Sequence, residues 1–274
     1  MKQSTRIEIA KSTLEIINKG FYLDSTGKKI DIKAACTNAI ANTRLYKPGE
    51  LDEILDTGNR ENNFTTAYEV VNETTLDAVR RLTAEMNLPV LCLNFASAKN
   101  PGGGFLGGAL AQEECIARAS ALYPCLLTAK EYYTFHRNLD TCLYSDHMIY
   151  SPLVPVIKDE DGALLDIPVY TSIITSPAVN AGVVRRNEPS KINQLLPVME
   201  NRIKKLLALA LHHQHNVLVL GAWGCGVFQN NPEDIAQLFY ESLTGEFSNQ
   251  FKKVVFAVKT NKEEMIVPFQ NRFS

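Results

Sequence analysis

Residues 89–114 have the sequence PVLCLNFASAKNPGGGFLGGALAQEE. The segment begins with a short apolar run, which is typical of a buried strand, and it ends in a polar, acidic stretch that suits the start of a helix. Three consecutive glycines, at positions 102–104, lie between the two. Ligands of α/β proteins bind in loops that follow strands and lead into helices. The stretch therefore predicts a strand, a ligand-binding loop and a helix, in that order.

Strands and helices alternate along the chain on both sides of this loop. A β-prone run at 67–71 is followed by a polar cap and the helical pattern LDAVRRLTAEM, and residues 89–94 form the next predicted strand. We expect later strands at 169–174, 217–220 and 254–258, and helices near 112–127, 193–211 and 232–244. This alternation is typical of a three-layer α/β fold around a mostly parallel sheet.

The first 64 residues differ in pattern from the rest of the chain. Apolar residues among charges at 5–20 predict an amphipathic helix that ends at Gly20, and the stretch 21–64 is rich in turn residues. The regular alternation begins at Thr65. We therefore expect residues 1–64 to form an N-terminal extension and residues 65–274 to form the core.

The composition is that of an ordinary globular domain, with 45% hydrophobic and 21% charged residues. A formal net charge of −2 gives no general attraction to nucleic acid or to anionic membranes, so local donors must hold any anionic ligand. The first residues lack the apolar run of a signal peptide, and no segment reaches the roughly 18 apolar residues of a spanning helix. These features predict a cytoplasmic protein with a small ligand, and with no membrane or sequence-specific nucleic acid partner.

The cysteines and histidines give no sign of a metal site. The six cysteines are widely spaced, with no C-x-x-C pair and no histidine at zinc-finger spacing, so neither disulfides nor structural zinc are expected. His212, His213 and His215 crowd together behind an apolar helix. A solvated helix end is the simplest interpretation of that cluster.

The glycine triplet has more than one interpretation. It removes side chains over about 10 Å of backbone, which lets a ligand approach main-chain N–H groups, or it is only a mobile turn. Gly102, Gly104 and Gly107 also match the pattern G-x-G-x-x-G. However, the first glycine lies well beyond the end of the strand, whereas nicotinamide-binding loops turn directly after it. The spacing therefore argues against a dinucleotide cofactor.

A second glycine loop, GAWGCGVF at 221–228, follows another predicted strand. The helix after it has Asn231 as a suitable cap and Pro232 at its first position. Gly224 and Gly226 allow successive N–H groups to point inward as an anion-binding nest, next to the positive end of that helix. Such a loop can hold a diphosphate without a lysine; the alternative is a simple glycine-rich connection.

Glu113 and Glu114 begin the predicted helix after the first loop. Acidic residues are common there because they complement the helix dipole, which is the purely structural interpretation. Adjacent helical residues diverge by about 100°, so the two carboxylates would play different roles at a ligand. A nearby diphosphate raises the pKa of a carboxylate, as a general acid requires, whereas pairing of Glu114 with Arg118 at i,i+4 lowers it. The sequence leaves that balance open.

Taken together, these motifs resemble those of the microbial branch of the poly(ADP-ribose) glycohydrolases. The signature of that family is three glycines, a short spacer and Gln-Glu-Glu, and here the seven-residue spacer FLGGALA separates Gly104 from Gln112. NFASAKNP before the glycines and GAWGCGVF in the second loop also match. The segments IYSPLVPV (149–156), IITSPAVNAG (173–182) and VVFAV (254–258) extend the resemblance over most of the chain.

The resemblance implies a macrodomain fold, which is an α/β/α sandwich, with an N-terminal helical extension. It also implies that Glu114 is the catalytic acid and base, and that Glu113 helps to hold the reacting ribose. Two departures from the animal enzymes, Ser97 and Ala222 in place of asparagines, mean that ribose contacts are expected to differ in detail. The substrate-binding residues that the resemblance implies are Asn94, Ser97, Asn100, Gly102, Gly103, Gly104, Gln112, Gly224, Cys225, Gly226, Val227 and Phe228.

The activity that the resemblance implies is hydrolysis of the ribose–ribose O-glycosidic bond of poly(ADP-ribose), with release of ADP-ribose from the chain end and without a cofactor or metal. One alternative is a macrodomain that binds ADP-ribose without cleaving it, and another is a hydrolase that removes single ADP-ribose units from protein or nucleic acid. The paired glutamates favour catalysis over binding alone. We expect a monomer whose substrate is poly(ADP-ribose) or ADP-ribosylated protein and whose product is ADP-ribose.

Overall fold

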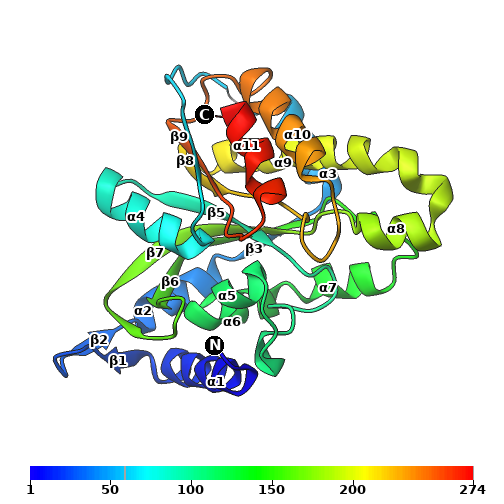
Figure 1. The fold of residues 1–274 in the computed structure, drawn as a ribbon. Helices are drawn as coiled ribbons and strands as arrows, with labels where there is room; N and C mark the ends of the chain where they lie inside the picture. Colours follow the sequence, from blue (N-terminus) through cyan, green and yellow to red (C-terminus); the bar gives the residue numbers. More distant parts are fainter. Residues whose placement is uncertain (59, 274) are drawn as a thin grey trace.

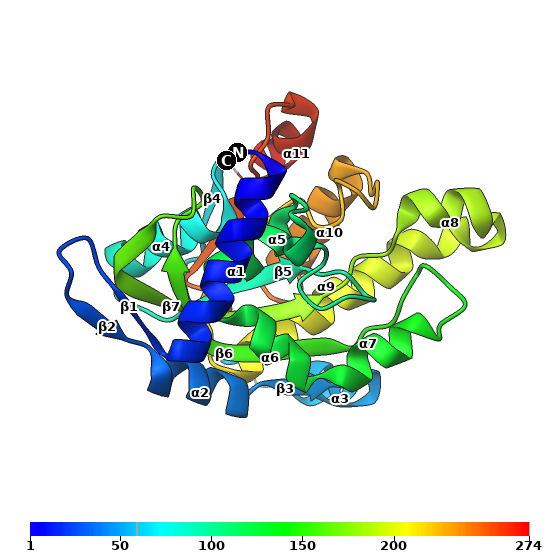
Figure 2. The ribbon, with the colours of Figure 1, turned by 90° about the horizontal axis from the view of Figure 1, so that it is seen from below.

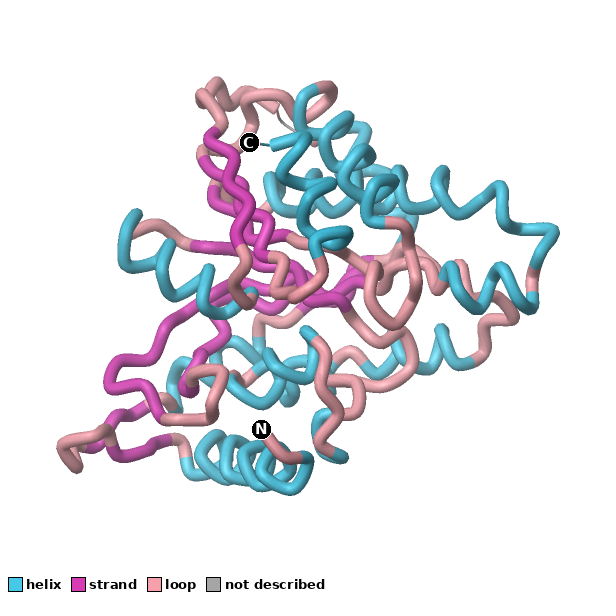
Figure 3. The backbone as a smooth tube through the Cα atoms, viewed as in Figure 1, coloured by secondary structure: helices cyan, strands magenta, loops and turns pink. Residues whose placement is uncertain are grey.

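A seven-stranded mixed sheet forms the centre of the molecule (Figure 1, Figure 3). The computed structural model describes residues 1–58 and 60–273. The strands are β3 (Arg44–Tyr46), β4 (Ala67–Val71), β5 (Val90–Phe95), β6 (Met148–Lys158), β7 (Leu164–Ser176), β8 (Val217–Leu220) and β9 (Lys253–Ala257). They lie in the order β3-β6-β7-β5-β8-β9-β4. The pairs from β7 to β4 are parallel, and β3 and β6 pair antiparallel at one edge, so the predicted mixed, mostly parallel sheet is confirmed.

Helices cover both faces of the sheet and complete the three predicted layers (Figure 1). One face carries α3 (Pro48–Thr57), α9 (Leu195–His212), α10 (Pro232–Thr244) and α11 (Glu263–Phe273). The other carries α2 (Lys33–Ala41), α4 (Thr75–Met86), α5 (Gln112–Ala119), α6 (Leu122–Thr128) and α7 (Lys130–Arg137). Alternation along β5 sends Leu91 and Leu93 into the first core and Val90 and Cys92 into the second.

Two helices begin at the residues that the local sequence predicts. The side chain of Thr74 accepts a hydrogen bond from the N–H of Asp77 at 3.2 Å and caps α4. The side chain of Asn231 accepts one from the N–H of Glu233 at 3.1 Å and caps α10. Pro232 occupies the first position of α10, where its missing N–H leaves no bond unmade. The predicted cap Asn231 is confirmed, and within the polar stretch predicted before α4 the capping residue is Thr74.

The N-terminal helix α1 (Gln3–Lys19) forms an outer layer over α5 (Figure 2). It ends at Gly20, whose φ of 79° is the left-handed conformation predicted for a helix-ending glycine. Ala10 packs against Phe105 of the 3₁₀ turn η1 (Phe105–Gly107) and against Ala117 of α5. The extension therefore contacts the loop that follows the glycine triplet.

Residues 21–64 contain more regular structure than their turn-rich sequence predicts. A small hairpin, β1 (Phe21–Leu23) with β2 (Lys29–Asp31), follows α1, and α2 and α3 come later. Between those two helices, β3 pairs antiparallel with β6 at the edge of the central sheet. The segment expected as an extension thus also contributes one strand to the sheet. Asn59, in the same segment, lies outside the described residues.

The single helix predicted near 112–127 is in fact two helices. α5 ends at Ala119 and α6 begins at Leu122, because Ser120 between them is extended, with φ −140° and ψ 172°. The N–H of Ala121 donates to the carbonyl of Pro155 in β6 at 2.9 Å, so the chain bonds to the sheet at the break. The helix that carries the two glutamates is therefore short.

The histidine cluster after α9 is not a solvated helix end, contrary to the prediction. His215 is 4% exposed, and its Nε2 lies 2.8 Å from the hydroxyl oxygen of Tyr150. The ring of His213 stacks on that of Tyr150, with centroids 3.5 Å apart, and only His212 is exposed. The stacking partner comes from β6, so the spacing of the histidines alone could not reveal it.

The remaining helical segments, α8 (Ala181–Asn187) and η2 (Pro189–Gln194), connect β7 to α9. Within the described ranges 1–58 and 60–273, no helix combines the length and the apolar character that crossing a membrane requires.

Candidate active site

A cavity of about 430 Å³ opens where the carboxyl ends of β5, β7 and β8 meet. Parallel strands bring their following loops together at this edge of a sheet, which is where α/β proteins bind ligands. The first glycine-rich loop leaves β5 and the second leaves β8, and both contribute to the cavity wall. The lining residues are Phe95, Ala96, Ser97, Leu110, Ala111, Gln112, Glu113, Glu114, Ala178, Ala222, Trp223, Gly224, Gly226, Val227 and Phe228.

Glu113 is 2% exposed, and both of its carboxylate oxygens accept hydrogen bonds. The backbone N–H of Ser97 donates to Oε2 at 2.6 Å, and the side-chain amide of Asn94 donates to Oε1 at 3.3 Å. Burial raises the pKa of Glu113 to about 8, against the lowering effect of these two bonds, and the charge of Glu114 adds to the rise. Glu113 is therefore a fixed carboxyl group whose buried environment favours the protonated form.

Glu114 is held by only one of its oxygens. Its Oε1 accepts a hydrogen bond from the N–H of Gly104 at 2.9 Å, and no donor in the described part of the chain reaches Oε2. The ion pair between Glu114 and Arg118, which the i,i+4 spacing allowed, does not form. Across residues 1–58 and 60–273, Arg118 makes no ion pair. Its guanidinium group donates instead to the carbonyl of Ala109 at 2.7 Å and to Sγ of Cys115 at 3.2 Å. Glu114 thus lines the cavity with one oxygen free of protein donors.

Gly103 leaves room for both carboxylates. Its φ of +58° lies in the left-handed region, which side-chain-bearing residues rarely adopt. A Cβ at this position would overlap Oε1 of Glu114 and would lie 3.2 Å from Oε2 of Glu113. The middle glycine of the triplet is therefore required by the two acids as well as by the backbone.

Gln112 anchors α5 to the central sheet. Its side-chain oxygen accepts a hydrogen bond from the N–H of Phe95 at 2.8 Å. Its side-chain NH₂ group donates to the carbonyl of Leu93 at 2.7 Å and to the hydroxyl of Thr75 at 3.0 Å. Gln112 lines the cavity, but the polar atoms of its side chain are engaged by the protein.

The second glycine loop offers free backbone N–H groups. Gly224 has φ 75°, and its carbonyl accepts bonds from the backbone and the side chain of Asn230, at 3.1 and 3.2 Å. For Gly226, Val227 and Phe228, no acceptor among the described residues lies within reach of the backbone N–H. Consecutive unpaired N–H groups suit the oxygen atoms of a diphosphate.

The structure divides the predicted site residues into two groups. Those that line the cavity are Ser97, Gln112, Glu113, Glu114, Gly224, Gly226, Val227 and Phe228. Those that do not line it are Asn94, Asn100, Gly102, Gly103, Gly104 and Cys225. Asn94 is fully buried behind Glu113, whereas Asn100 is exposed and its N–H donates to the hydroxyl of Ser97 at 3.1 Å.

A second cavity, of about 530 Å³, adjoins the first and was not predicted. Its wall includes Glu73, two residues before α4, and Lys259 after β9. These residues are far apart in the sequence, so no local pattern could connect them. Leu110, which is 66% exposed, lines both cavities. The lining residues that the two cavities share are Phe95, Leu110, Ala111, Gln112 and Ala222.

Comparisons with known proteins identify the family. The family model described as microbial-type PARG, catalytic domain, matches residues 10–159, more than half of the chain. The crystal structure of poly(ADP-ribose) glycohydrolase (PARG) from Thermomonospora curvata has a TM-score of 0.94 and 43% identity, over 98% of this chain and 100% of that one. The structure of the Thermomonospora curvata protein with the inhibitor ADP-HPD has a TM-score of 0.91, with the same identity of 43% and the same coverage of 98% and 100%.

A poly(ADP-ribose) glycohydrolase from a second organism is similar as well. The Deinococcus radiodurans structure in complex with ADP-ribose has a TM-score of 0.83 and 43% identity, over 87% of this chain and 97% of that one. A comparison with curated protein sequences gives no match. The family model and the structures agree, and the chain belongs to the microbial-type poly(ADP-ribose) glycohydrolase family.

Proposed function

We propose that this chain hydrolyses the ribose–ribose O-glycosidic bond of poly(ADP-ribose) and releases ADP-ribose. The observation that carries the proposal is the pair Glu113 and Glu114, on the wall of a cavity that also contains the N–H groups of residues 226–228, which have no acceptor among the described residues. Cleavage of a glycoside that bears a diphosphate requires an acid beside an anion-binding site. The family, and relatives whose structures contain ADP-ribose or ADP-HPD, support the same substrate class.

The two adjoining cavities fit an elongated ligand with different ends. In our proposal the terminal ribose lies beside Glu114, the diphosphate contacts the N–H groups of residues 226–228, and the adenosine half passes Leu110 into the second cavity. The shared lining residues and volumes of about 430 and 530 Å³ support this path. Backbone donors then hold the negative charge, as the net charge of −2 leads us to expect.

In the proposed reaction Glu114 acts first as an acid and then as a base. Its proton passes to the 2′-oxygen of the departing ribose as the glycosidic C–O bond breaks. The resulting carboxylate takes a proton from the water that attacks the anomeric carbon, which restores Glu114. Oε2 of Glu114, which no donor of residues 1–58 and 60–273 reaches, supports this role, whereas both oxygens of Glu113 are held by Ser97 and Asn94. Glu113 keeps the reacting ribose in place.

Cleavage from the chain end is part of the proposal. Gln3 and Arg6 of α1 donate hydrogen bonds to the carbonyls of Gly107 and Gly108, at 2.8 and 2.6 Å. The helix thereby fixes the loop that leads to Leu110 at the cavity rim. In our proposal, this fixed wall stops the polymer from continuing beyond a terminal ADP-ribose unit.

The proposed site needs one chain only, because this chain supplies the lining residues of both cavities. We therefore propose that the protein acts as a monomer. Its location in the cytoplasm stays a prediction from the sequence.

Product analysis tests the proposed function. Purified protein is incubated with auto-modified poly(ADP-ribose) and, separately, with a singly ADP-ribosylated protein. At the earliest time points, we expect the polymer to release free ADP-ribose and no oligomers of two or more units. We expect the singly modified protein to stay unchanged. Release from the singly modified protein alone would identify a mono-ADP-ribosyl hydrolase, and binding without any product would identify a module that only binds ADP-ribose.

A further inference from the structure

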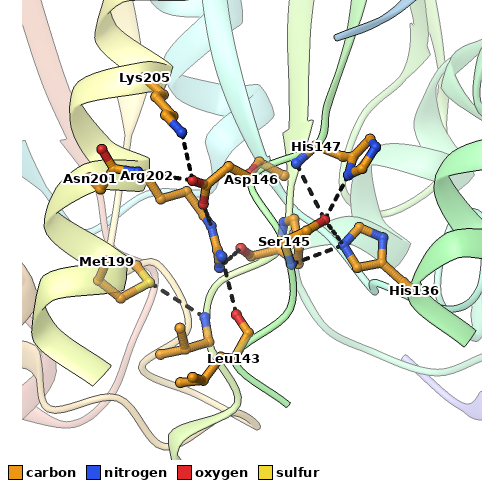
Figure 4. A network of polar contacts seen from close by, with 12 residues as sticks. His136, Leu143, Ser145, Asp146, His147, Met199, Asn201, Arg202 and Lys205 are labelled. Atoms are coloured by element: carbon orange, nitrogen blue, oxygen red, sulfur yellow. Dashed lines mark hydrogen bonds and ion pairs between the residues drawn. The ribbon is translucent and has the colours of Figure 1, made fainter. Parts of the chain in front are cut away.

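We infer that Arg202 of α9 is a positioning residue for the anion-binding side of the active site. The inference deepens the proposed function and rests on it. Arg202 is fully buried and lines neither cavity. Figure 4 shows its side chain reaching from α9 to the loop that carries Leu143 and Asp146. Nothing in the local sequence around Arg202 connects it to the glycine loops.

The guanidinium group of Arg202 joins two separate segments. Its Nε donates to Oδ1 of Asp146 at 2.9 Å, and its Nη2 donates to the carbonyl of Leu143 at 3.1 Å. Its Nη1 donates to the carbonyl of Pro177, directly after β7, at 2.9 Å. Because a guanidinium is planar and presents its donors in a fixed fork, it sets the relative position of its acceptors. Arg202 therefore fixes the loop before β6 against the segment after β7.

The segment after β7 supports the start of the second glycine loop. Ala178 lines the first cavity, and a Cβ on Gly224 would overlap it, so the two segments touch. The side-chain amide of Asn230 donates to the carbonyl of Val179 at 2.8 Å and to that of Gly224 at 3.2 Å. Sδ of Met199, also on α9, accepts the N–H of Val179 at 3.4 Å. A shift of this segment therefore moves the glycine loop.

The loop before β6 supports the other end of the same glycine loop. Tyr144 lies between Leu143 and Asp146, the two residues of this loop that accept hydrogen bonds from Arg202. The φ of Tyr144 is 56°. Its ring centroid is 6.0 Å from that of Phe228, which ends the glycine loop and lines the cavity. A tyrosine with positive φ needs surrounding contacts to hold it there. Arg202 thus acts on the loop at both ends, at Gly224 and at Phe228.

Lys205 provides a matched control, because it shares Asp146 with Arg202 but, among the described residues, makes no bond to the segment after β7. Oδ2 of Asp146 accepts hydrogen bonds from Lys205 and Asn201, both at 2.9 Å. Burial alone would raise the pKa of Asp146, but the charge of Arg202 and the bond from Lys205 bring it below its ordinary value. Lys205 is 3% exposed, and its partners in the described part of the chain are Asp146 and Asp52.

The test compares Arg202→Lys, Arg202→Met and Lys205→Met in the full chain. We expect the Kd for ADP-ribose and the KM for polymer to rise about tenfold in both Arg202 variants, with a much smaller fall in kcat. The pH profile of kcat stays unchanged, because both acids lie on α5 and not on the second glycine loop. Lys205→Met is expected to lower the melting temperature and to leave Kd and KM within about twofold of wild type.

A purely structural role for Arg202 predicts a different result. In that case the Arg202 substitutions lower the amount of folded protein or its melting temperature, and the Kd of the folded fraction stays unchanged. That result overturns the inference. If neither Arg202 variant folds, Met199→Leu is the deciding variant, because it removes only the acceptor of the Val179 N–H. A raised Kd for ADP-ribose then supports the inference, and an unchanged Kd overturns it. Wild-type protein that neither binds ADP-ribose nor cleaves polymer would instead overturn the proposed function.

Discussion

Oε1 of Glu114 accepts a hydrogen bond from the backbone N–H of Gly104 at 2.9 Å. The last glycine of the triplet therefore holds the acid at the start of the following helix. This bond leaves Oε2 of Glu114 without a protein donor in the described residues, and it makes the glycine loop part of the carboxylate's environment rather than a mobile connection.

Gly103→Ala is expected to lower kcat by at least about tenfold, because the new Cβ displaces the carboxylate of Glu114. The left-handed backbone at this residue lowers the free energy of unfolding of the variant by about 1–2 kcal/mol. Gly107→Ala is the control in the same loop, since a Cβ there meets no atom of the described residues within 4 Å. Activity assays and thermal unfolding of both variants check the prediction, and equal effects at the two positions would contradict it.

Leu110→Ser is expected to weaken substrate binding more than it slows catalysis. Leu110 lines both cavities and is 66% exposed, so a ligand that crosses between them would cover it. Losing the contribution of this apolar surface to the binding free energy, about 1–2 kcal/mol, corresponds to a rise in KM of roughly five- to thirtyfold. Leu106→Ser is the matched control, because Leu106 is 47% exposed and lines neither cavity. A KM that changes equally in both variants would exclude this path for the ligand.

Glu113→Gln is expected to change how stability depends on pH. The pKa of Glu113 is about 8 in the folded chain, against the ordinary value of 4.5. Between these values the folded state holds a proton that the unfolded state has lost, so wild type loses stability as the pH rises, by up to about 1.4 kcal/mol per pH unit. The variant cannot ionise, so its melting temperature relative to wild type should rise from pH 5 to pH 8. A constant difference would show that burial does not raise this pKa.

Arg6→Ala is expected to lower kcat/KM by about fivefold, the equivalent of about 1 kcal/mol, because α1 then loses its bond to the carbonyl of Gly108. Lys11→Ala changes an exposed residue of the same helix and is expected to leave kcat/KM at the wild-type value. Initial rates on polymer measure both. An Arg6 variant with full activity would show that α1 does not hold the cavity rim.

The sequence predicts those parts of the fold that have local signals. β4, β5, β8 and β9 are compact apolar or β-branched runs, and Thr74, Asn231 and Gly20 mark helix ends through their own side chains or backbone. Both glycine loops were expected at the ends of strands, and residues of both loops line one cavity, although the glycines 102–104 do not.

Features that depend on distant partners could not be predicted. The break between α5 and α6 depends on Pro155 in β6, and the burial of His215 depends on Tyr150. The engaged side chain of Gln112 and the second cavity likewise arise from segments that only folding brings together. Only the folded chain gives a physical reason to propose separate roles for the two glutamates. Both oxygens of Glu113 accept hydrogen bonds, whereas only Oε1 of Glu114 does so among the described residues.

Turnover by Glu114→Gln is the most direct test of the central claim, which is that Glu114 is the catalyst. The substitution keeps the size of the side chain and removes its exchangeable acid proton. We expect the rate of ADP-ribose release from polymer to fall by about 10²- to 10⁴-fold, while the Kd for ADP-ribose stays within about threefold of wild type. A variant that still releases ADP-ribose at the wild-type rate would contradict the claim.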